Sequence, residues 1–226
     1  MKKHAHSRAE TPGTGAIAPP APRAGAQRQK VLQWLDDHVP AARLEHILRV
    51  EEMAIALAQH HNLDAEKAGQ AGLMHDLAKY FKPQRLLDMA RQEGLSIDPV
   101  DEANPHLLHA DVGAIVARDE FGIEDEDVLQ AIRNHTLGYP GMGALSCVVF
   151  LADSLEPGRG DTPELHALRQ ASRDNLHQAV WQTCNYTLQY LLHNRQLIHP
   201  RAITTRNWFL QQARRPQPVP PASPAP

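Results

Sequence analysis

The sequence predicts an all-α fold, a bundle of roughly eight to ten helices. Apolar residues recur at three- and four-residue spacing through most of the chain, which is the period of a helix with one buried face. No convincing run alternates apolar and polar residues, as a half-buried strand would. Proline and glycine fall between the helical segments, where helices begin and end. The 226 residues suit one domain with tails, because a domain commonly holds about 100–200 residues.

Proline also marks the two ends of the predicted domain. Four of the 18 prolines lie in 1–26 and six lie in 216–226, among alanine, glycine and serine. Such segments have almost no apolar surface to bury, so the cost of ordering the chain is not offset. We therefore expect Pro-rich disordered tails at 1–26 and 213–226, around one folded domain at 27–212.

The first four predicted helices are recognised by their apolar spacing and their end signals. The first has three apolar residues on one side, and the second is a long amphipathic run. Asp64 is the expected N-cap of the third helix. Pro83 opens the fourth at its first turn, and Gly94 closes it. The predicted ranges are Gln27–His38, Ala41–His60, Ala65–Tyr80 and Gln84–Glu93.

The remaining helices carry similar signals. Pro105 opens the fifth, and Gly122 follows it. The sixth begins with four acidic residues, which suit the positive end of a helix dipole. The seventh ends before Pro157, and three further amphipathic runs complete the domain. The predicted ranges are His106–Glu120, Glu124–Asn134, Gly143–Leu155, Pro163–Ser172, Leu176–His193 and Pro200–Gln211.

The composition excludes several classes of protein. With 26 acidic and 23 basic residues the net charge is −3, which argues against a DNA or RNA partner. The longest apolar stretch, 144–152, is far shorter than the roughly 20 residues that span a bilayer. No secretory signal is recognisable, and Cys147 and Cys184 form no CxxC pair. We expect a cytoplasmic protein without a membrane partner, and the sequence leaves a homodimer open.

Histidine is abundant, with 14 residues, and several histidines fall on core-facing stripes. His46, for example, shares an apolar face with Val50, Met53 and Leu57. An unpaired buried charge is very costly, and a buried polar group without a partner also costs free energy. Ionisable residues from five predicted helices therefore need a common explanation. These residues are His46, His75, Asp76, His109, His135 and Asp153.

A metal centre provides that explanation. Imidazole and carboxylate ligands suit Fe, Mn, Zn, Co or Ni, and the absence of thiolate argues against a structural zinc site. The adjacent pair His75–Asp76 can offer two ligands to one ion, and the two oxygens of Asp76 can bridge two ions. A single histidine on an apolar face is more often a core residue than a ligand. We assign no site role to His60, His61, His166, His177, His193 and His199.

Nearby residues are candidates for binding phosphate. Lys79 lies one turn beyond the His–Asp pair, either toward an anionic substrate or as a solvated lysine at a helix end. Arg159 offers a fork of donors just beyond Asp153. Thr136 and Gly138 lie in a loop whose backbone N–H groups could also meet phosphate. Arg43 is a weaker candidate.

These residues carry a specific resemblance. The order His46, His75–Asp76 and Asp153 resembles the H…HD…D pattern of the HD-domain metal-dependent phosphohydrolase superfamily. Within it, the sequence is similar to the YqeK family of symmetrical diadenosine tetraphosphate hydrolases, in the family's order and spacing over 43–159. The matching stretches are Arg43–His46, Ala71–Lys79, Leu107–Ala114, Ala131–Gly138 and Leu151–Arg159.

The resemblance implies an HD-domain helical bundle and the hydrolysis of diadenosine tetraphosphate to two ADP by a metal-activated water. It implies iron, with Mn, Co, Ni or Zn as substitutes and one or two ions. The implied metal ligands are His46, His75, Asp76 and Asp153, with His109 and His135 open as ligands of a second ion. The resemblance implies phosphate contacts from His109, His135 and Arg159, with Asp76 and Asp153 close to the ligand. With the candidates from the residues themselves added, the predicted substrate-binding residues are His46, Asp76, Lys79, His109, His135, Thr136, Asp153 and Arg159, and the predicted catalytic residues are Asp76, Lys79, His109 and His135.

Two other functions stay open at this point. Another HD-domain phosphohydrolase, such as a nucleotidase or a guanosine tetraphosphate hydrolase, would share the metal site and differ in the pocket. A non-catalytic nucleotide-binding module would need lost ligands or a filled site, whereas all six ionisable residues are present. The tripeptide Gly138-Tyr139-Pro140 matches the GYP of cyclic-di-GMP phosphodiesterases, but the longer element around it is absent, so we treat it as chance.

Overall fold

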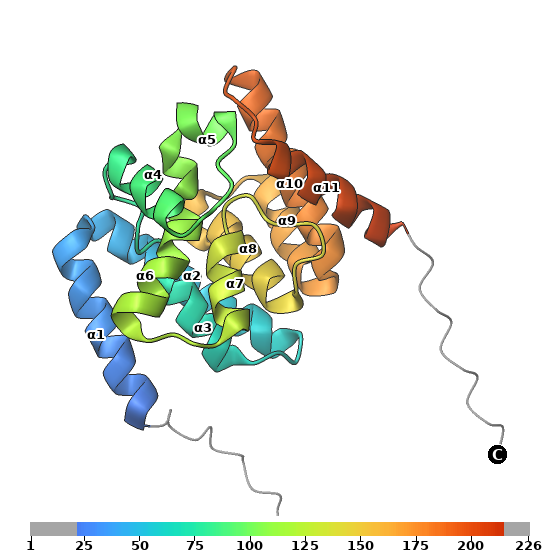
Figure 1. Cartoon of the computed structure of the whole chain (residues 1–226). Coiled ribbons are helices and arrows are strands. Elements are labelled where there is room, and N and C mark those ends of the chain that lie inside the picture. Colours follow the sequence, from blue (N-terminus) through green and yellow to red (C-terminus); the bar gives the residue numbers. More distant parts are fainter. Residues whose placement is uncertain (1–21, 215–226) are drawn as a thin grey trace, which may run out of the picture.

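The computed structural model describes residues 22–214 and, within that range, contains only helices (Figure 1). The all-α prediction is therefore confirmed, with one helix more than the upper end of the expected range. The eleven α-helices are α1 (Pro22–His38), α2 (Ala41–His60), α3 (Ala65–Met74), α4 (Pro83–Gln92), α5 (Pro99–Ala103), α6 (His109–Phe121), α7 (Glu126–Asn134), α8 (Ala144–Leu155), α9 (Pro163–Asp174), α10 (Leu176–His193) and α11 (Pro200–Ala213). Two 3₁₀ helices, η1 (Pro105–Leu108) and η2 (Pro157–Arg159), complete them.

The core lies where α2, α3, α7 and α8 pack together. Every residue from Ser146 to Ala152 of α8 is buried, as expected for the most apolar stretch of the chain. Gly72 lets α2 and α3 approach closely, since a Cβ there would lie 3.1 Å from Glu51 Cα. Figure 1 shows α1 on one side of the molecule and the α10–α11 pair on the other. The six ionisable residues come from helices that meet in this core.

Several helix ends follow the predicted signals. Asp64 caps α3 as expected, accepting hydrogen bonds from the N–H groups of Glu66 (2.9 Å) and Lys67 (3.0 Å). Gly122 ends α6 in the left-handed conformation at φ 66°. Asp125 caps α7, which begins two residues later than predicted. No helix of the described residues is long and apolar enough to cross a membrane.

Two predicted helix boundaries are wrong near the ionisable residues. The expected helix 65–80 ends at Met74, and 75–80 form turns. His75 Nδ1 donates to Gly72 O at 2.7 Å, the carbonyl that the next helical N–H would need. The expected helix 106–120 divides into η1 and α6, so His109 begins α6.

The chain ends also differ in extent from the predicted tails. Helix α1 begins at Pro22, so 22–26 are helical although we expected a disordered tail to 26. At the other end, α11 continues to Ala213. The remaining parts of the predicted tails, 1–21 and 215–226, lie outside the described residues. The short helix α5 was not predicted, although Asp98 and Pro99 are ordinary signals for a helix start.

Candidate active site

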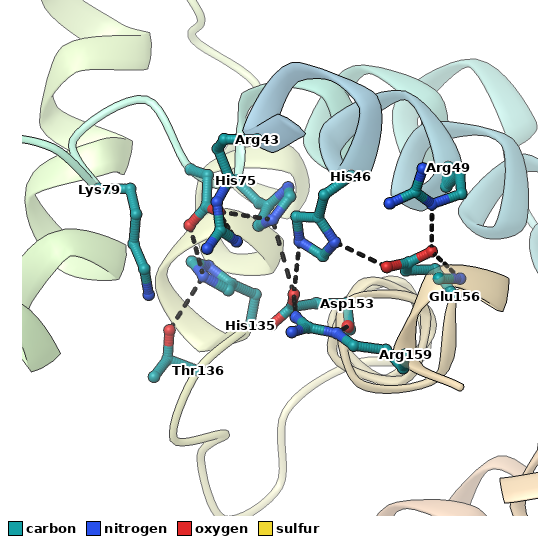
Figure 2. Close-up of polar contacts among 12 residues, drawn as sticks. Arg43, His46, Arg49, His75, Lys79, His135, Thr136, Asp153, Glu156 and Arg159 are labelled. Atoms are coloured by element: carbon teal, nitrogen blue, oxygen red, sulfur yellow. Dashed lines mark hydrogen bonds and ion pairs between the residues drawn. The ribbon is translucent and has the colours of Figure 1, made fainter. Parts of the chain in front are cut away.

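The six ionisable residues meet in one cluster at the centre of the bundle, and Figure 2 shows His46, His75, His135 and Asp153 among them. His46 Nε2 lies 3.1 Å from Asp153 Oδ1, and His75 Nε2 lies 3.7 Å from the same oxygen. Asp76 Oδ2 lies 3.4 Å from His75 Nε2. All six are buried except Asp153, whose side chain is 18% exposed. Residues far apart in the sequence thus face one another, as the core-facing stripes predicted.

Three of the histidines are oriented by the same local device. Each donates Nδ1–H to the carbonyl oxygen three residues earlier: His75 at 2.7 Å, His135 at 2.7 Å, and His109 to His106 O. Each histidine lies at a helix end, and the acceptor carbonyl has two lone pairs, so it can accept the ring N–H even where it also accepts a backbone N–H. Since Nδ1 carries the proton, Nε2 of each ring offers a lone pair to the cluster.

The fourth histidine is oriented from a distance. His46 lies within α2, and its Nδ1 donates to Glu156 Oε1 at 3.0 Å. Glu156 Oε2 in turn accepts from Arg49 Nε at 2.6 Å and from the Gly158 N–H at 2.5 Å. Figure 2 shows Glu156 between His46 and Arg49. His46 Nε2 therefore also points its lone pair toward Asp153.

The buried Nε2 atoms fit a metal cation. The Nε2 atoms of His46 and His75 are buried and have no hydrogen-bond partner among the described residues. Each faces a carboxylate oxygen, which can only accept when ionised. Lone pairs of imidazole and carboxylate that face one another repel, and a positive charge between them would stabilise the arrangement. The donor set, nitrogen and oxygen without sulfur, matches the predicted metal chemistry.

Asp76 belongs to two such groups. Its Oδ2 is on the side of His46 and His75, while its Oδ1 lies 3.3 Å from His109 Nε2 and 3.7 Å from His135 Nε2. The Nε2 atoms of His109 and His135 lie 3.1 Å apart. The carboxylate of Asp76 is therefore shared by two sets of three donors, with one set on the side of each of its oxygens.

The electrostatics of the cluster favour bound positive charge. Burial disfavours the charged form of His75, but the adjacent Asp76 carboxylate outweighs it and raises the pKa of His75. Burial would raise the pKa of Asp153, yet its contact with His46 and the charges around it hold that pKa well below its usual range. Burial lowers the pKa of His135 to about 3, helped by His75 and His109. His135 is thus neutral at pH 7 and its Nε2 is free to accept.

The candidate phosphate-binding residues border the cluster. Lys79 Nζ lies 3.3 Å from His109 Nε2, and Thr136 Oγ1 lies 2.9 Å from His135 Nε2. Arg159 Nη2 donates to Asp153 Oδ1 at 2.5 Å, and its Nε donates to Asp153 O. Arg43 Nη1 donates to Asp76 Oδ2 at 3.1 Å. Lys79 is therefore turned toward the cluster rather than away from it.

Gly138 does not meet the expectation for a phosphate-binding backbone group. Its N–H donates to Asn134 O at 2.9 Å and is not available to a ligand. Its Cα instead packs against Thr205 of α11. The positive φ of 63° explains why glycine occupies this position.

A cavity of about 720 Å³ adjoins the cluster. Lys79, Thr136, Asp153 and Arg159 line its polar end. Its other walls come largely from α8, α10 and the start of α11, and are mostly apolar. They include Leu137, Phe150, Tyr186, Tyr190, Leu191 and Leu197. The part of the cavity beside the cluster is therefore charged, and the rest is mostly apolar.

Sequence reasoning missed three residues around the site. Glu156 and Arg49 orient His46, and His199 lines the cavity while capping α11 through its side chain. Glu156 could have been found from its place three residues after Asp153, in a stretch already singled out. Nothing in the sequence indicates that Arg49, on α2, meets it. Of the other histidines without a site role, His60 and His61 contact carbonyls of α9.

Comparison with known proteins agrees with this geometry. The HD domain family matches residues 43–158. Proteins named symmetrical bis(5'-nucleosyl)-tetraphosphatase from Halalkalibacterium halodurans and Bacillus subtilis are 38% and 34% identical, each over 81% of this chain and 97% of the relative. The crystal structure of a predicted HD superfamily hydrolase involved in NAD metabolism from Clostridium acetobutylicum has a TM-score of 0.78 and 33% identity, covering 81% of this chain and 97% of that one. The chain therefore belongs to the HD domain family, in the group of hydrolases that includes these relatives.

Proposed function

We propose that this protein hydrolyses diadenosine tetraphosphate symmetrically, giving two ADP, with a metal centre built on the six-residue cluster. The observation that carries the proposal is the shared carboxylate of Asp76 between two sets of donors, at the charged end of a cavity. The names of the relatives from H. halodurans and B. subtilis support the choice of substrate.

The first metal ion would be held by His46, His75, Asp76 and Asp153. We propose iron as the physiological ion, because imidazole and carboxylate suit it and the resemblance to the YqeK family implies it. A second cation would be held by Asp76, His109 and His135. A cation fits there better than a phosphate oxygen, because the Nε2 atoms of both rings are acceptors.

A metal ion held by these residues would lower the pKa of its bound water from about 15.7 towards about 7 and so would supply the nucleophile. The chain supplies groups for the phosphates. Lys79 and Arg159 carry positive charge at the mouth of the cluster, and Thr136 offers a hydroxyl. Cations and donors placed there stabilise the charge that spreads over phosphate oxygens during transfer. Lys79, through its contact with His109, is close enough to the cluster for this role.

The apolar end of the cavity would take one nucleoside. Ligand pockets commonly measure about 300–1,000 Å³ and are mostly apolar with a few polar groups, and this cavity fits that description. Tyr186 and Tyr190 line it and offer aromatic faces for an adenine base. The charged end would then hold the phosphates of the same half of the substrate.

Product analysis tests the proposal. The protein, purified without chelator, is given iron or cobalt and then diadenosine tetraphosphate, and the nucleotides are separated by chromatography. We expect ADP as the sole product, and activity that is lost with EDTA and restored by the metal. AMP with ATP would place cleavage at another bond, and no turnover with any of Fe, Mn, Co, Ni or Zn would overturn the proposed substrate. Metal analysis of the same preparation tests the choice of iron and the number of ions.

A further inference from the structure

His46 is the one site histidine, among those in the described residues, that is not oriented by its own turn. It lies inside α2, and its Nδ1 does not donate to a carbonyl three residues earlier as the other three do. Its Nδ1 reaches Glu156, which lies 110 residues later in the chain. We propose that Glu156 is a positioning residue for His46, and that Arg49 and Gly158 hold Glu156 in place.

A carboxylate is the group that this position requires. Three N–H donors converge on Glu156: His46 Nδ1 on Oε1, and Arg49 Nε and Gly158 N on Oε2. An ionised carboxylate has no proton of its own and accepts from all three. Glu156 is only 2% exposed, so water cannot replace a missing acceptor. A glutamine there would turn its amide N–H₂ toward at least one of these donors.

Gly158 also leaves the space that the Arg49 side chain occupies. A Cβ at Gly158 would lie 2.6 Å from Arg49 Nη2 and 2.7 Å from Arg49 Nε. The guanidinium therefore packs directly against the Gly158 backbone. An alanine at this position would keep the N–H that Glu156 accepts but would displace Arg49. Because the displaced atoms are the end of a flexible side chain, the fold tolerates the change.

The consequence is a chain of contacts from Gly158 through Arg49 and Glu156 to His46. It fixes the proton of His46 on Nδ1 and aims Nε2 at the place where the first metal ion is proposed. This inference rests on the metal site of the proposed function but not on its substrate. Groups that orient a metal-binding histidine typically change metal affinity by about 10–100-fold when they are replaced.

The test measures Co²⁺ affinity by calorimetric titration of the full chain, after its metal has been removed with a chelator. Glu156→Gln, Arg49→Lys and Gly158→Ala are compared with wild type, with Arg118→Ala as the control. Arg118 pairs with Glu93, the residue that follows α4, away from the cluster. We expect about 10–100-fold weaker binding for Glu156→Gln and smaller losses for the other two. The control should bind as the wild type does, and circular dichroism verifies the fold of each variant.

A second readout needs no metal. Nitrogen NMR of the metal-free protein reports which ring nitrogen of each histidine carries the proton. In Glu156→Gln, His46 should lose its preference for Nδ1–H, while His75 and His135 should keep theirs because their acceptors are backbone carbonyls. A merely structural role for Glu156 would not change His46 alone.

A double variant tests the order of the contacts. In an Arg49→Ala background, Gly158→Ala should cause no further loss of Co²⁺ affinity, because the side chain it displaces is absent. Additive losses would overturn the link between Gly158 and Arg49. Co²⁺ affinity within twofold of wild type for Glu156→Gln, with His46 still protonated on Nδ1, would overturn the proposal as a whole. If wild type fails to cleave the nucleotide yet the affinities fall as expected, the proposed substrate fails and the positioning role stands.

Discussion

The two halves of the His–Asp cluster are built in different ways. His75, His109 and His135 are each held by a carbonyl three residues earlier, so their orientation is set within one turn of chain. The other half, His46 and Asp153, is held by Glu156 and Arg159, and the contact between α2 and Glu156 spans 110 residues. The first half depends on local geometry, whereas the second depends on how α2 and α8 pack.

This difference indicates which histidines should keep their orientation when nearby side chains are substituted, and which should not. A local hydrogen bond to backbone survives most side-chain substitutions nearby, because no neighbouring side chain takes part in it. A bond between distant side chains is lost when either partner changes or when the helices shift. Substitutions should therefore affect the two halves to different extents, which experiments can measure.

The largest effect should come from Asp76, because it belongs to both sets of three donors, the one with His46 and His75 and the one with His109 and His135. We expect Asp76→Ala to lower kcat/KM by more than about a hundredfold, since even groups that only orient a ligand account for about 10–100-fold. Metal analysis should show loss from both sets of donors. His135→Ala, which removes one donor of the second set alone, is the matched comparison and should retain the first ion. Asp76→Ala with its full metal content would contradict the assignment of Asp76 as a shared ligand.

A smaller effect is expected from the two phosphate-binding cations. Lys79→Ala and Arg159→Ala should each lower kcat by about a hundredfold, the scale on which one stabilising donor acts in a transition state. They differ in their effect on the metal, because Arg159 also holds Asp153 and Lys79 holds no carboxylate of the cluster. Co²⁺ affinity should thus fall for Arg159→Ala and stay unchanged for Lys79→Ala. Unchanged activity in Lys79→Ala would show that its assigned role is wrong.

The smallest effect should appear in stability rather than in chemistry. Gly138 has a φ of 63°, and a Cβ there would lie 2.5 Å from Thr205 Cγ2. Gly138→Ala should cost about 1–3 kcal/mol of the free energy of unfolding. For a domain of this size we expect Tm to fall by about 2–12 °C, measured by calorimetry.

The matched variant removes the methyl group that a side chain at Gly138 would meet. Thr205→Ser keeps the hydroxyl that donates to Arg201 O and deletes Cγ2. Combined with Gly138→Ala, it should recover part of the lost stability. No recovery would assign the whole cost to the backbone conformation.

The fold could be predicted because helices leave a periodic signal along the chain. That signal is local, and the boundaries it gave were wrong where side chains compete with the backbone. The predicted helix 65–80 ends at Met74, where the next residues form turns and the His75 ring donates to the Gly72 carbonyl. Helix α5, with five residues, is too short to show a period, although its capping residues were visible.

The site could be predicted in part for a related reason. A histidine or aspartate on an apolar stripe is conspicuous because burial needs an explanation, and six such residues pointed to one cluster. Glu156 lies on no apolar stripe, since it follows the end of α8 near proline and glycine, and only its place three residues after Asp153 pointed to it. Arg49 pairs with it only once α2 and η2 are brought together. Contacts of this kind depend on tertiary packing, which the sequence pattern does not show.

The cavity has a consequence for how the proposed reaction would end. In the proposed binding mode its apolar wall would take one nucleoside, and the two halves of diadenosine tetraphosphate are identical, so either end could enter. After cleavage, the half left in the cavity is already a product molecule. ADP should therefore compete with the intact dinucleotide for the same surface, and the rate would slow as product accumulates. Under the proposed function, this shared use of the adjoining pocket would make the protein responsive to the ADP concentration around it.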